Sequence, residues 1–189
     1  KDFHINSVDF GVAQNRRRVV MIAWRTPALD VPDLEKSLRV TLRDVLLIAD
    51  GVANHNPTEL AVDSKHRKIA ERIGPGQKLT NARGGELAVH TWDIPEVFGP
   101  TNKAQREVLN TVLRLRRQAR RRDFGDADPV STKILVGMFG KDILVQLVQK
   151  GYLRQYPKFH DLTNTFNGKY RRLEMDGVSR TVDTRFGDC

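Results

Sequence analysis

The sequence is poor in cysteine, and its only one, Cys189, is the last of 189 residues. One cysteine excludes an internal disulfide framework. Long apolar runs are missing too: the longest wholly aliphatic run, Val45–Ala49, falls far short of the roughly 20 residues that a membrane span needs, and no segment resembles a signal peptide. The five histidines are scattered without zinc-ligand spacing. We therefore expect neither a metal site nor a membrane segment.

Acidic residues are also in deficit. The chain has 32 Lys and Arg against 23 Asp and Glu, a net charge of +9 with a pI near 10, while 39% hydrophobic residues place it in the globular class. Splitting the chain after Lys103 gives 15 basic and 13 acidic residues (+2) before the split and 17 and 10 (+7) after it. The excess positive charge is concentrated in the second half, and it favours a polyanionic partner.

A cluster of six arginines lies within residues 113–122. The chain as a whole has 21 Arg and 11 Lys, a bias toward the planar group that bonds phosphate and guanine edges bidentately. Two interpretations stay open for this cluster: a phosphate-binding surface, or a solvated face of a basic helix.

The first hundred residues predict few regular elements. The β-branched run at 19–24 is typical of a strand buried on both faces, and we infer that it belongs to a parallel sheet whose other strands lie upstream. Residues 26–36 predict a linker. Helices are expected over Thr41–Ala49 and Asp63–Ile73, the second with Asp63 as its N-cap.

The chain from Asn102 onward has clearer helical signals. Asn102 and Gln105 form a capping-box pattern before a long amphipathic helix, roughly 103–122. Asp128-Pro129 predicts the start of a helix that runs to about Met138. A further helix is expected over Asp142–Lys150, ended by Gly151 in the left-handed conformation.

A hairpin is predicted after these helices. Asn167-Gly168 joins two strand-like runs, 161–166 and 169–174, and Asn-Gly is a strong two-residue turn signal. In that register Asn164 pairs with Arg171, and Arg171 and Arg172 point to opposite faces. Three helices followed by a hairpin is the order of elements in a winged helix-turn-helix, here spanning about 102–175. The alternative is a structural wing that contacts no partner.

A motif near the N-terminus carries a family resemblance. Asn6 is followed by Asp9-Phe10-Gly11-Val12-Ala13-Gln14-Asn15-Arg16-Arg17-Arg18 and then by the apolar run. This block resembles one of the DNA cytosine C5-methyltransferases: Asn, Asp-Tyr-Gly-Val-Pro-Gln-x-Arg-x-Arg and a hydrophobic strand. The present sequence departs from that pattern at Phe10 and Ala13. Residues 166–173 and 179–186 look like the end of the target-recognition region in bacterial members, and the basic helix and the Asn54-His55 stretch look like one bacterial branch.

The resemblance implies a reaction and a division of the chain. The family transfers a methyl group from S-adenosylmethionine to C5 of a flipped cytosine, with a Pro-Cys-Gln nucleophile block and a Glu-Asn-Val block on a Rossmann-like domain. Neither block occurs here, and the surroundings of Cys189 are unsuited to a nucleophile. We therefore expect a piece of a longer protein that is inactive alone and binds no cofactor by itself. Residues 1–25 would end the catalytic domain, and 26–189 would form an α+β target-recognition domain.

The resemblance also assigns site residues. Gln14, Arg16 and Arg18 would support the catalytic loop, although pairing with backbone or carboxylates would account for them equally well. Candidate contacts to double-stranded DNA fall into a phosphate-binding helix face and a set near the C-terminus. These candidates are Arg114, Arg117 and Arg121 on the helix, and Lys169, Arg171, Arg172, Arg180, Thr181 and Arg185 beyond it.

Alternative functions remain open from the sequence. A stand-alone winged-helix DNA-binding regulator would need no methyltransferase partner. This hypothesis does not account for the apolar strand after Asp9, which would have no other strand to pair with. A purely structural scaffold would show no salt-sensitive affinity for DNA. The first hypothesis implies two partners, DNA and the missing catalytic part, and a cytoplasmic bacterial location.

Overall fold

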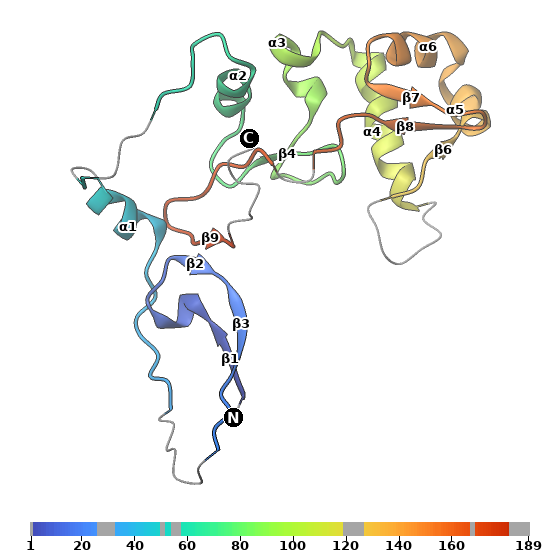
Figure 1. The fold of residues 1–189 in the computed structure, drawn as a ribbon. Coiled ribbons are helices and arrows are strands. Elements are labelled where there is room, and N and C mark those ends of the chain that lie inside the picture. The colour runs from blue at the N-terminus through green and yellow to red at the C-terminus, as the bar shows by residue number, and fades with distance from the viewer. Residues whose placement is uncertain are drawn as a thin grey trace. The chain divides into compact units, whose positions relative to one another are not determined.

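The computed structural model describes residues 2–25, 33–49, 52–53, 58–118, 127–166 and 169–181. The chain divides into two compact units: unit 1 comprises residues 1–59 and 173–189, and unit 2 comprises residues 60–172. Both mix helices with small sheets (Figure 1). This division differs from the predicted boundary at residue 25, and the assignment of catalytic and recognition parts stays a prediction.

Unit 1 is built on an antiparallel hairpin. Strand β1 (Asp2–Asn6) pairs with β3 (Arg17–Met21), with His4 opposite Val19. Between them lie a 3-10 helix at Ser7–Phe10 and β2 (Gln14–Asn15). Gly11 ends the 3-10 helix with a φ of 72°, a conformation that glycine adopts without steric cost.

The end of the chain returns to this hairpin. Strand β9 (Ser179–Arg180) pairs in parallel with β2, placing Gln14 opposite Ser179. Helix α1 (Leu42–Ala49) agrees with the predicted helix and is tied to the same returning segment, because the backbone N–H groups of Leu42 and Arg43 donate to the carbonyls of Gly177 and Met175. Unit 1 is therefore closed by residues more than 130 positions apart.

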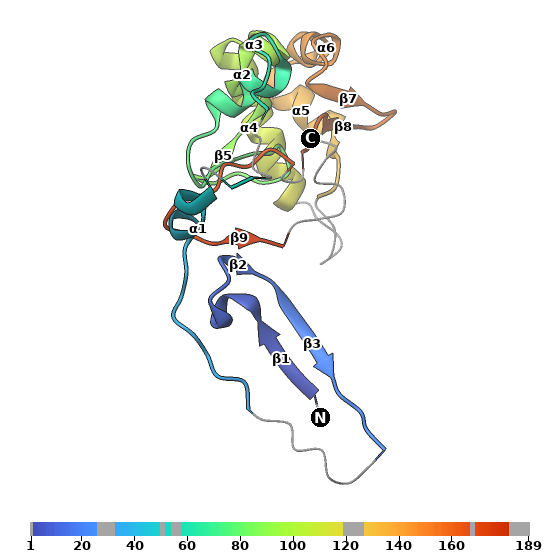
Figure 2. The same cartoon turned by 60° about the vertical axis from the view of Figure 1, so that its left-hand side comes forward.

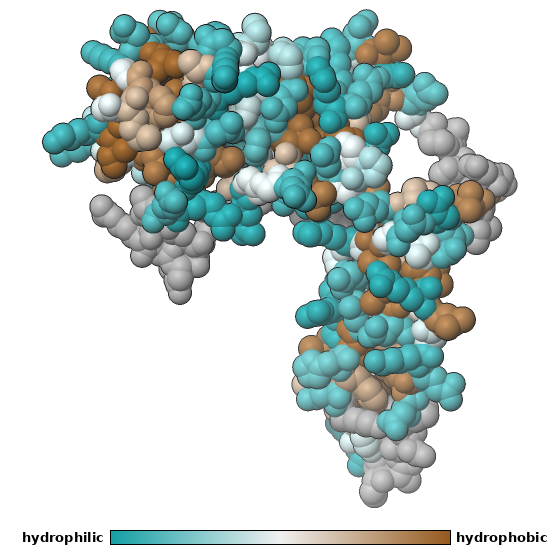
Figure 3. Space-filling model, turned by 180° about the vertical axis from the view of Figure 1, so that it is seen from behind, coloured by the Kyte–Doolittle hydropathy of each residue, from teal (hydrophilic) through white to brown (hydrophobic). Residues whose placement is uncertain are grey.

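Strand β3 exists as predicted, but the prediction that it is buried on both faces is wrong for this structure. All five of its residues are exposed, including Val19 at 60% and Met21 at 73% of their full surface. Its pairing with β1 is antiparallel, and in the described residues no helix or second sheet layer covers it. Figure 3 shows apolar residues at the surface of this part of the chain. Membership in a sheet with upstream strands stays a prediction.

Unit 2 begins with a small apolar core. Helix α2 (Lys65–Arg72), the parallel pair β4 (Lys78–Leu79) and β5 (Ala88–Val89), and the short helix α3 (Pro95–Phe98) surround it. Its buried members are Ile69, Ile73, Leu79, Val89 and Ile94. The N-cap of α2 is Ser64, whose hydroxyl accepts from the Arg67 N–H at 3.1 Å, so the prediction of Asp63 is wrong by one residue.

The larger core of unit 2 lies among three helices and a three-stranded sheet. Helix α4 (Lys103–Gln118) is followed by β6 (Val130–Ser131), α5 (Thr132–Phe139), α6 (Lys141–Gln149), β7 (Leu153–Gln155) and β8 (Phe159–Leu162). The strand order is β6-β8-β7, all antiparallel (Figure 1), and Figure 2 shows β7 and β8 from a second side. Val108, Leu109, Leu135, Leu144 and Leu153 are among its buried side chains.

Local sequence signals account for the helix ends in this core. Asn102 and Gln105 form the predicted capping box: the Gln105 N–H donates to Asn102 Oδ1 at 2.8 Å, and the Asn102 N–H donates to Gln105 Oε1 at 3.2 Å. Gly151 has the left-handed φ expected after α6. Helix α5 begins at Thr132 rather than at Pro129 with Asp128 as N-cap, because Val130 and Ser131 pair with His160 and Phe159. The predicted end of α4, at 119–122, lies outside the described residues.

The predicted hairpin register is wrong. Arg171 forms a bridge with Lys78, and the Tyr170 carbonyl accepts from the Leu79 N–H at 2.9 Å, so this segment pairs with β4. The hairpin that follows α6 is β7–β8, with Leu153 opposite Leu162. Asn164 and Phe166 have φ values of 48° and 33°, which end the extended conformation before residue 167. The Asn167-Gly168 turn itself lies outside the described residues.

Candidate nucleic-acid interface

Helix α4 places three of its five basic residues along one face. The helical period puts positions 103, 107, 110, 114 and 117 on a single face, because they are separated by three or four residues. All five are exposed, whereas Val108, Leu109 and Val112 on the opposite side are fully buried. Lys103, Arg114 and Arg117 are cations, and Glu107 is the one acid of the five. We call these five residues the α4 stripe.

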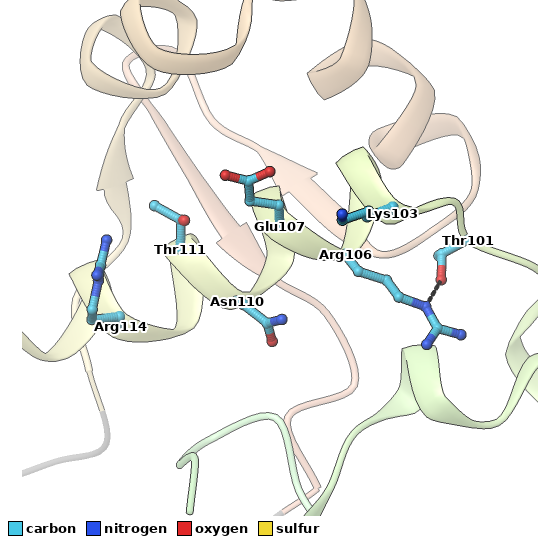
Figure 4. Close-up of a pocket in the computed structure, with 7 residues that line it drawn as sticks. All are labelled: Thr101, Lys103, Arg106, Glu107, Asn110, Thr111 and Arg114. Atoms are coloured by element: carbon cyan, nitrogen blue, oxygen red, sulfur yellow. Dashed lines mark hydrogen bonds between the residues drawn. The ribbon is translucent and has the colours of Figure 1, made fainter.

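A groove of about 860 Å³ follows this face (Figure 4). Its charged lining residues are three basic and one acidic, which leaves a net charge of +2. Arg106 borders the groove and is oriented by its Nε–H, which donates to Thr101 Oγ1 at 3.1 Å. The side chains of Lys103 and Arg114 form no hydrogen bond or ion pair within the described residues. Among the described residues, the groove thus keeps a net positive charge.

The length of the α4 stripe suits an extended polyanion. Lys103 and Arg117 are 14 residues apart, which is about 21 Å of helix axis at about 1.5 Å per residue. Duplex DNA rises about 3.4 Å per base pair, so this distance corresponds to about six base pairs. Arg121, predicted on the same face, lies outside the described residues.

Arg116 differs from its neighbours in the arginine cluster. Only 3% of its surface is exposed, and its Nε lies 2.5 Å from Asp161 Oδ1 on β8. Its guanidinium also donates to the Asn81 carbonyl at 3.1 Å. The interpretation of the whole cluster as an outer helix face is therefore wrong at this position, because the inward side of α4 has a carboxylate to pair with.

The basic residues before the C-terminus are separated by their contacts. Lys169 is exposed, Arg171 is half-buried in the bridge with Lys78, and Arg172 donates to the Ile73 carbonyl at 3.2 Å. These three lie in unit 2 beside β4, whereas Arg180 and Thr181 lie in unit 1. Arg185 lies outside the described residues. The structure therefore divides the predicted C-terminal set between the two units.

The Gln-x-Arg-x-Arg segment lies beside β9. Gln14 Nε2 donates to the Arg180 carbonyl at 3.3 Å, and Thr181 Oγ1 donates to the Asn15 carbonyl at 3.2 Å. Arg18 donates to the carbonyl of Arg17 at 2.7 Å. The Arg16 backbone N–H donates to Asn6 Oδ1 at 3.0 Å, which joins the predicted Asn to the motif. Two segments singled out separately from the sequence thus form one structural element.

Sequence reasoning missed the N-terminal half of the groove. Lys103, Arg106 and Asn110 line it together with Arg114. The signal was present, because extending the spacing of 114 and 117 backward by three or four residues reaches 110, 107 and 103. The dense arginine run at 113–122 is the stronger local signal, and the longer pattern is sparser.

Two histidines of unit 2 have pKa values lowered by burial. His160 lies on β8, where Thr132 Oγ1 is 2.9 Å from its Nδ1, and burial holds its pKa below 6.5. His90 stacks on Trp92 with ring centroids 4.6 Å apart, and burial lowers its pKa too. Both rings are therefore neutral at pH 7 and serve packing rather than phosphate binding.

Other classes of site are missing from the part of the chain that the structure describes. No group of three or more His, Cys, Asp or Glu residues there is placed to hold a metal ion. No helix among the same residues is both long and apolar enough to cross a bilayer. The α4 stripe and its groove are left as the strongest candidate interface.

The chain is similar to Type II methyltransferases. It is 30% identical to M.NlaIV of Neisseria lactamica, over 82% of this chain and 37% of that protein. It is 29% identical to M.HgiBI of Herpetosiphon aurantiacus, over 93% of this chain and 42% of that protein. It is 31% identical to M.NgoBV of Neisseria gonorrhoeae, over 82% of this chain and 37% of that protein.

The extent of the match is informative. The chain spans about two fifths of the length of the methyltransferase relatives it matches. A match over 93% of this chain includes most of both units, so the similarity is not confined to the Gln-x-Arg-x-Arg segment. No family model matches the chain, and no solved structure matches it significantly.

Proposed function

We propose that this chain is the DNA-recognition part of a DNA cytosine C5-methyltransferase, which binds duplex DNA so that the full enzyme methylates a flipped cytosine. The observation that carries the proposal is the similarity to Type II methyltransferases over 82 to 93% of the chain. The α4 stripe supplies the electrostatic surface that such a part requires, because protein cations replace the counterions of DNA phosphates.

The choice of cytosine C5 as the methylated atom rests on the N-terminal segment. Gln14, Arg16 and Arg18 match the family motif, and Gln14 is hydrogen-bonded to the returning segment at Arg180. If this motif lies beside an active site, we expect it to be held in place by the segment that comes after the recognition region in sequence, residues 179–181. Pairing of β2 with β9 supports this expectation. Other methylation targets on DNA would not predict this motif.

The described residues do not fit S-adenosylmethionine. The cofactor carries a positively charged sulfonium, and the α4 groove is lined by three basic residues and one acid. The pocket of about 470 Å³ beside β1 and β3 is lined by Arg17 and Arg18 with only Asp9 as an acid. We therefore assign no cofactor site to the described part, and methyl transfer would depend on the catalytic part of the full enzyme.

Salt dependence of DNA binding tests the recognition role. If Lys103, Arg114 and Arg117 each neutralise one phosphate, the logarithm of affinity falls with a slope of about −2.7 against the logarithm of salt concentration. Raising salt from about 50 to 200 mM then weakens binding about 40-fold, as fluorescence anisotropy with a labelled duplex would measure. The double variant Arg114→Ala/Arg117→Ala should bring the slope close to −1.

The matched control is Lys133→Ala, which removes an exposed cation from α5. It should leave both affinity and slope near their wild-type values. Affinity that does not change with salt, or an equal loss for the control and the α4 double variant, would overturn the assignment of the stripe to phosphate binding.

Methylation chemistry needs a separate test. The full-length protein, expressed in a host without cytosine methylation, should produce 5-methylcytosine in host DNA, as mass spectrometry of nucleosides would detect. N4-methylcytosine or N6-methyladenine instead would refute the C5 assignment while leaving DNA recognition intact.

A stand-alone winged-helix DNA-binding regulator is the second candidate. The order α4-β6-α5-α6-β7-β8, with strand order β6-β8-β7, favours it, because a winged helix-turn-helix adds a small sheet to three helices. The same subdomain is compatible with the recognition part of an enzyme. The coding sequence upstream of Lys1 separates the two: a Pro-Cys-Gln block favours the enzyme, and its absence from the gene favours the regulator.

A further inference from the structure

An exposed loop projects between β4 and β5 in unit 2. All five of its residues, 83–87, are exposed, whereas the three before them, 80–82, are almost completely buried. Gly85 has a φ of 123°, which an L-residue rarely adopts, and a Cβ atom there would meet nothing within 4 Å. The loop carries one cation, Arg83, and one large apolar side chain, Leu87, which is 55% exposed.

The base of this loop is held by a buried hydrogen-bond hub around Asn81. Its amide donates to Thr91 Oγ1 at 2.9 Å and accepts from the Thr91 N–H at 3.1 Å. Its backbone N–H donates to the Thr165 carbonyl at 3.0 Å, and its carbonyl accepts from Arg116. Arg116 is itself paired with Asp161. Side chains on α4, β8 and the β5–α3 connection therefore fix the position from which the loop projects.

The loop lies against the helix that carries the α4 stripe. A Cβ atom at Gly84 would lie 3.6 Å from Leu113 Cδ2. Leu113 precedes Arg114 in sequence and is one helical turn before Arg117. Both features belong to unit 2, and the loop meets α4 at the residue that directly precedes Arg114 of the stripe.

Arg83 is not used by the fold. Its side chain has no hydrogen bond or ion pair with another described residue. Two arginines on the neighbouring helix show the contrast, because Arg116 is buried in an ion pair and Arg106 is oriented by Thr101. The hydrogen bonds of Asn81 already hold the backbone at the base of the loop, so binding through Arg83 would have to order mainly the arginine side chain.

We propose that Arg83 is a specificity-determining residue that contacts a guanine edge in the major groove while the α4 stripe holds the adjacent phosphates. The proposal rests on the DNA-recognition function proposed above. A guanidinium bonds O6 and N7 of guanine bidentately, and this pairing carries sequence information that a phosphate contact does not. The exposed Leu87 supports base contact over phosphate contact, because apolar groups contact base edges such as the thymine methyl.

The test is selection from a pool of duplexes with a randomised central region. The 189-residue chain is compared with Arg83→Ala, with Arg83→Lys and with Arg117→Ala. The wild type should enrich a sequence that contains guanine at a defined position. Arg83→Ala should lose preference for that guanine by about 5- to 150-fold, which corresponds to one bidentate pair. Arg83→Lys should recover affinity but not the full preference, because an ammonium lacks the planar fork.

The outcomes separate this inference from the proposed function. Arg117→Ala should weaken all sequences alike and leave the enriched sequence unchanged. If wild type enriches a sequence and Arg83→Ala enriches the same one with equal preference, the role of Arg83 is wrong and DNA recognition stands. If wild type binds no duplex, the proposed function fails first. Thermal unfolding of each variant should match wild type, since Arg83 is exposed and unpaired.

Discussion

The buried ion pair between Arg116 and Asp161 gives the sharpest prediction for unit 2. Asp161→Asn removes the negative charge with little change in volume and leaves the Arg116 guanidinium uncompensated. The two side chains are 4% and 19% exposed, so water replaces the lost partner poorly. Loss of one partner of a buried pair costs more than the pair contributes, because desolvation of the remaining charge is no longer offset.

The size of the effect follows from that burial. Breaking a buried pair costs about 3 to 5 kcal/mol, and the partial exposure of Asp161 favours the lower end, about 3 kcal/mol. For a domain near the size of unit 2, each kcal/mol shifts the melting temperature by about 3 to 6 °C. Asp161→Asn should therefore lower it by about 10 to 20 °C. The double variant Arg116→Met/Asp161→Leu should lose less than Asp161→Asn, because it leaves no buried charge.

Calorimetry and urea unfolding measure these changes, with Arg117→Met as the matched control. Arg117 is exposed on the same helix, and its replacement should change the free energy of unfolding by less than about 0.5 kcal/mol. Equal small shifts for Asp161→Asn and Arg117→Met would refute the reasoning, as would a double variant less stable than the single one.

Two further predictions concern the core and the histidines of unit 2. Leu109→Ala, at a fully buried site on α4, should cost about 2 to 5 kcal/mol of unfolding free energy in urea titration, whereas Val145→Ala, at an exposed site, should cost far less. His160 and His90 have folded pKa values below their unfolded ones, so the unfolded chain binds more protons as the pH falls below about 6.5. Stability should therefore be full above that pH and decrease toward pH 5, and His160→Asn should reduce this slope; a profile flat from pH 7.5 to 5 would contradict the assignment.

The sequence by itself determined the features that depend on short-range chemistry. The capping box at Asn102 and Gln105, the amphipathic pattern of α4 and the left-handed Gly151 all involve groups within a few residues of one another. These local interactions do not depend on how the rest of the chain is arranged. The resemblance to DNA cytosine C5-methyltransferases also came from a contiguous motif. The similarity of the chain to Type II methyltransferases agrees with the methyltransferase part of that resemblance.

Tertiary structure decided which arginines of a uniform cluster face outward. Arg114 and Arg117 are exposed while Arg116 is buried, and only the position of Asp161 on β8, 45 residues away, makes that burial favourable. It also decided that 170–172 pairs with β4, because strand partners are chosen by long-range packing and not by the turn between two runs. The loop at Arg83 belongs to the same class: its sequence indicates a turn, but its rigid base and its place beside α4 come from residues distant in the chain.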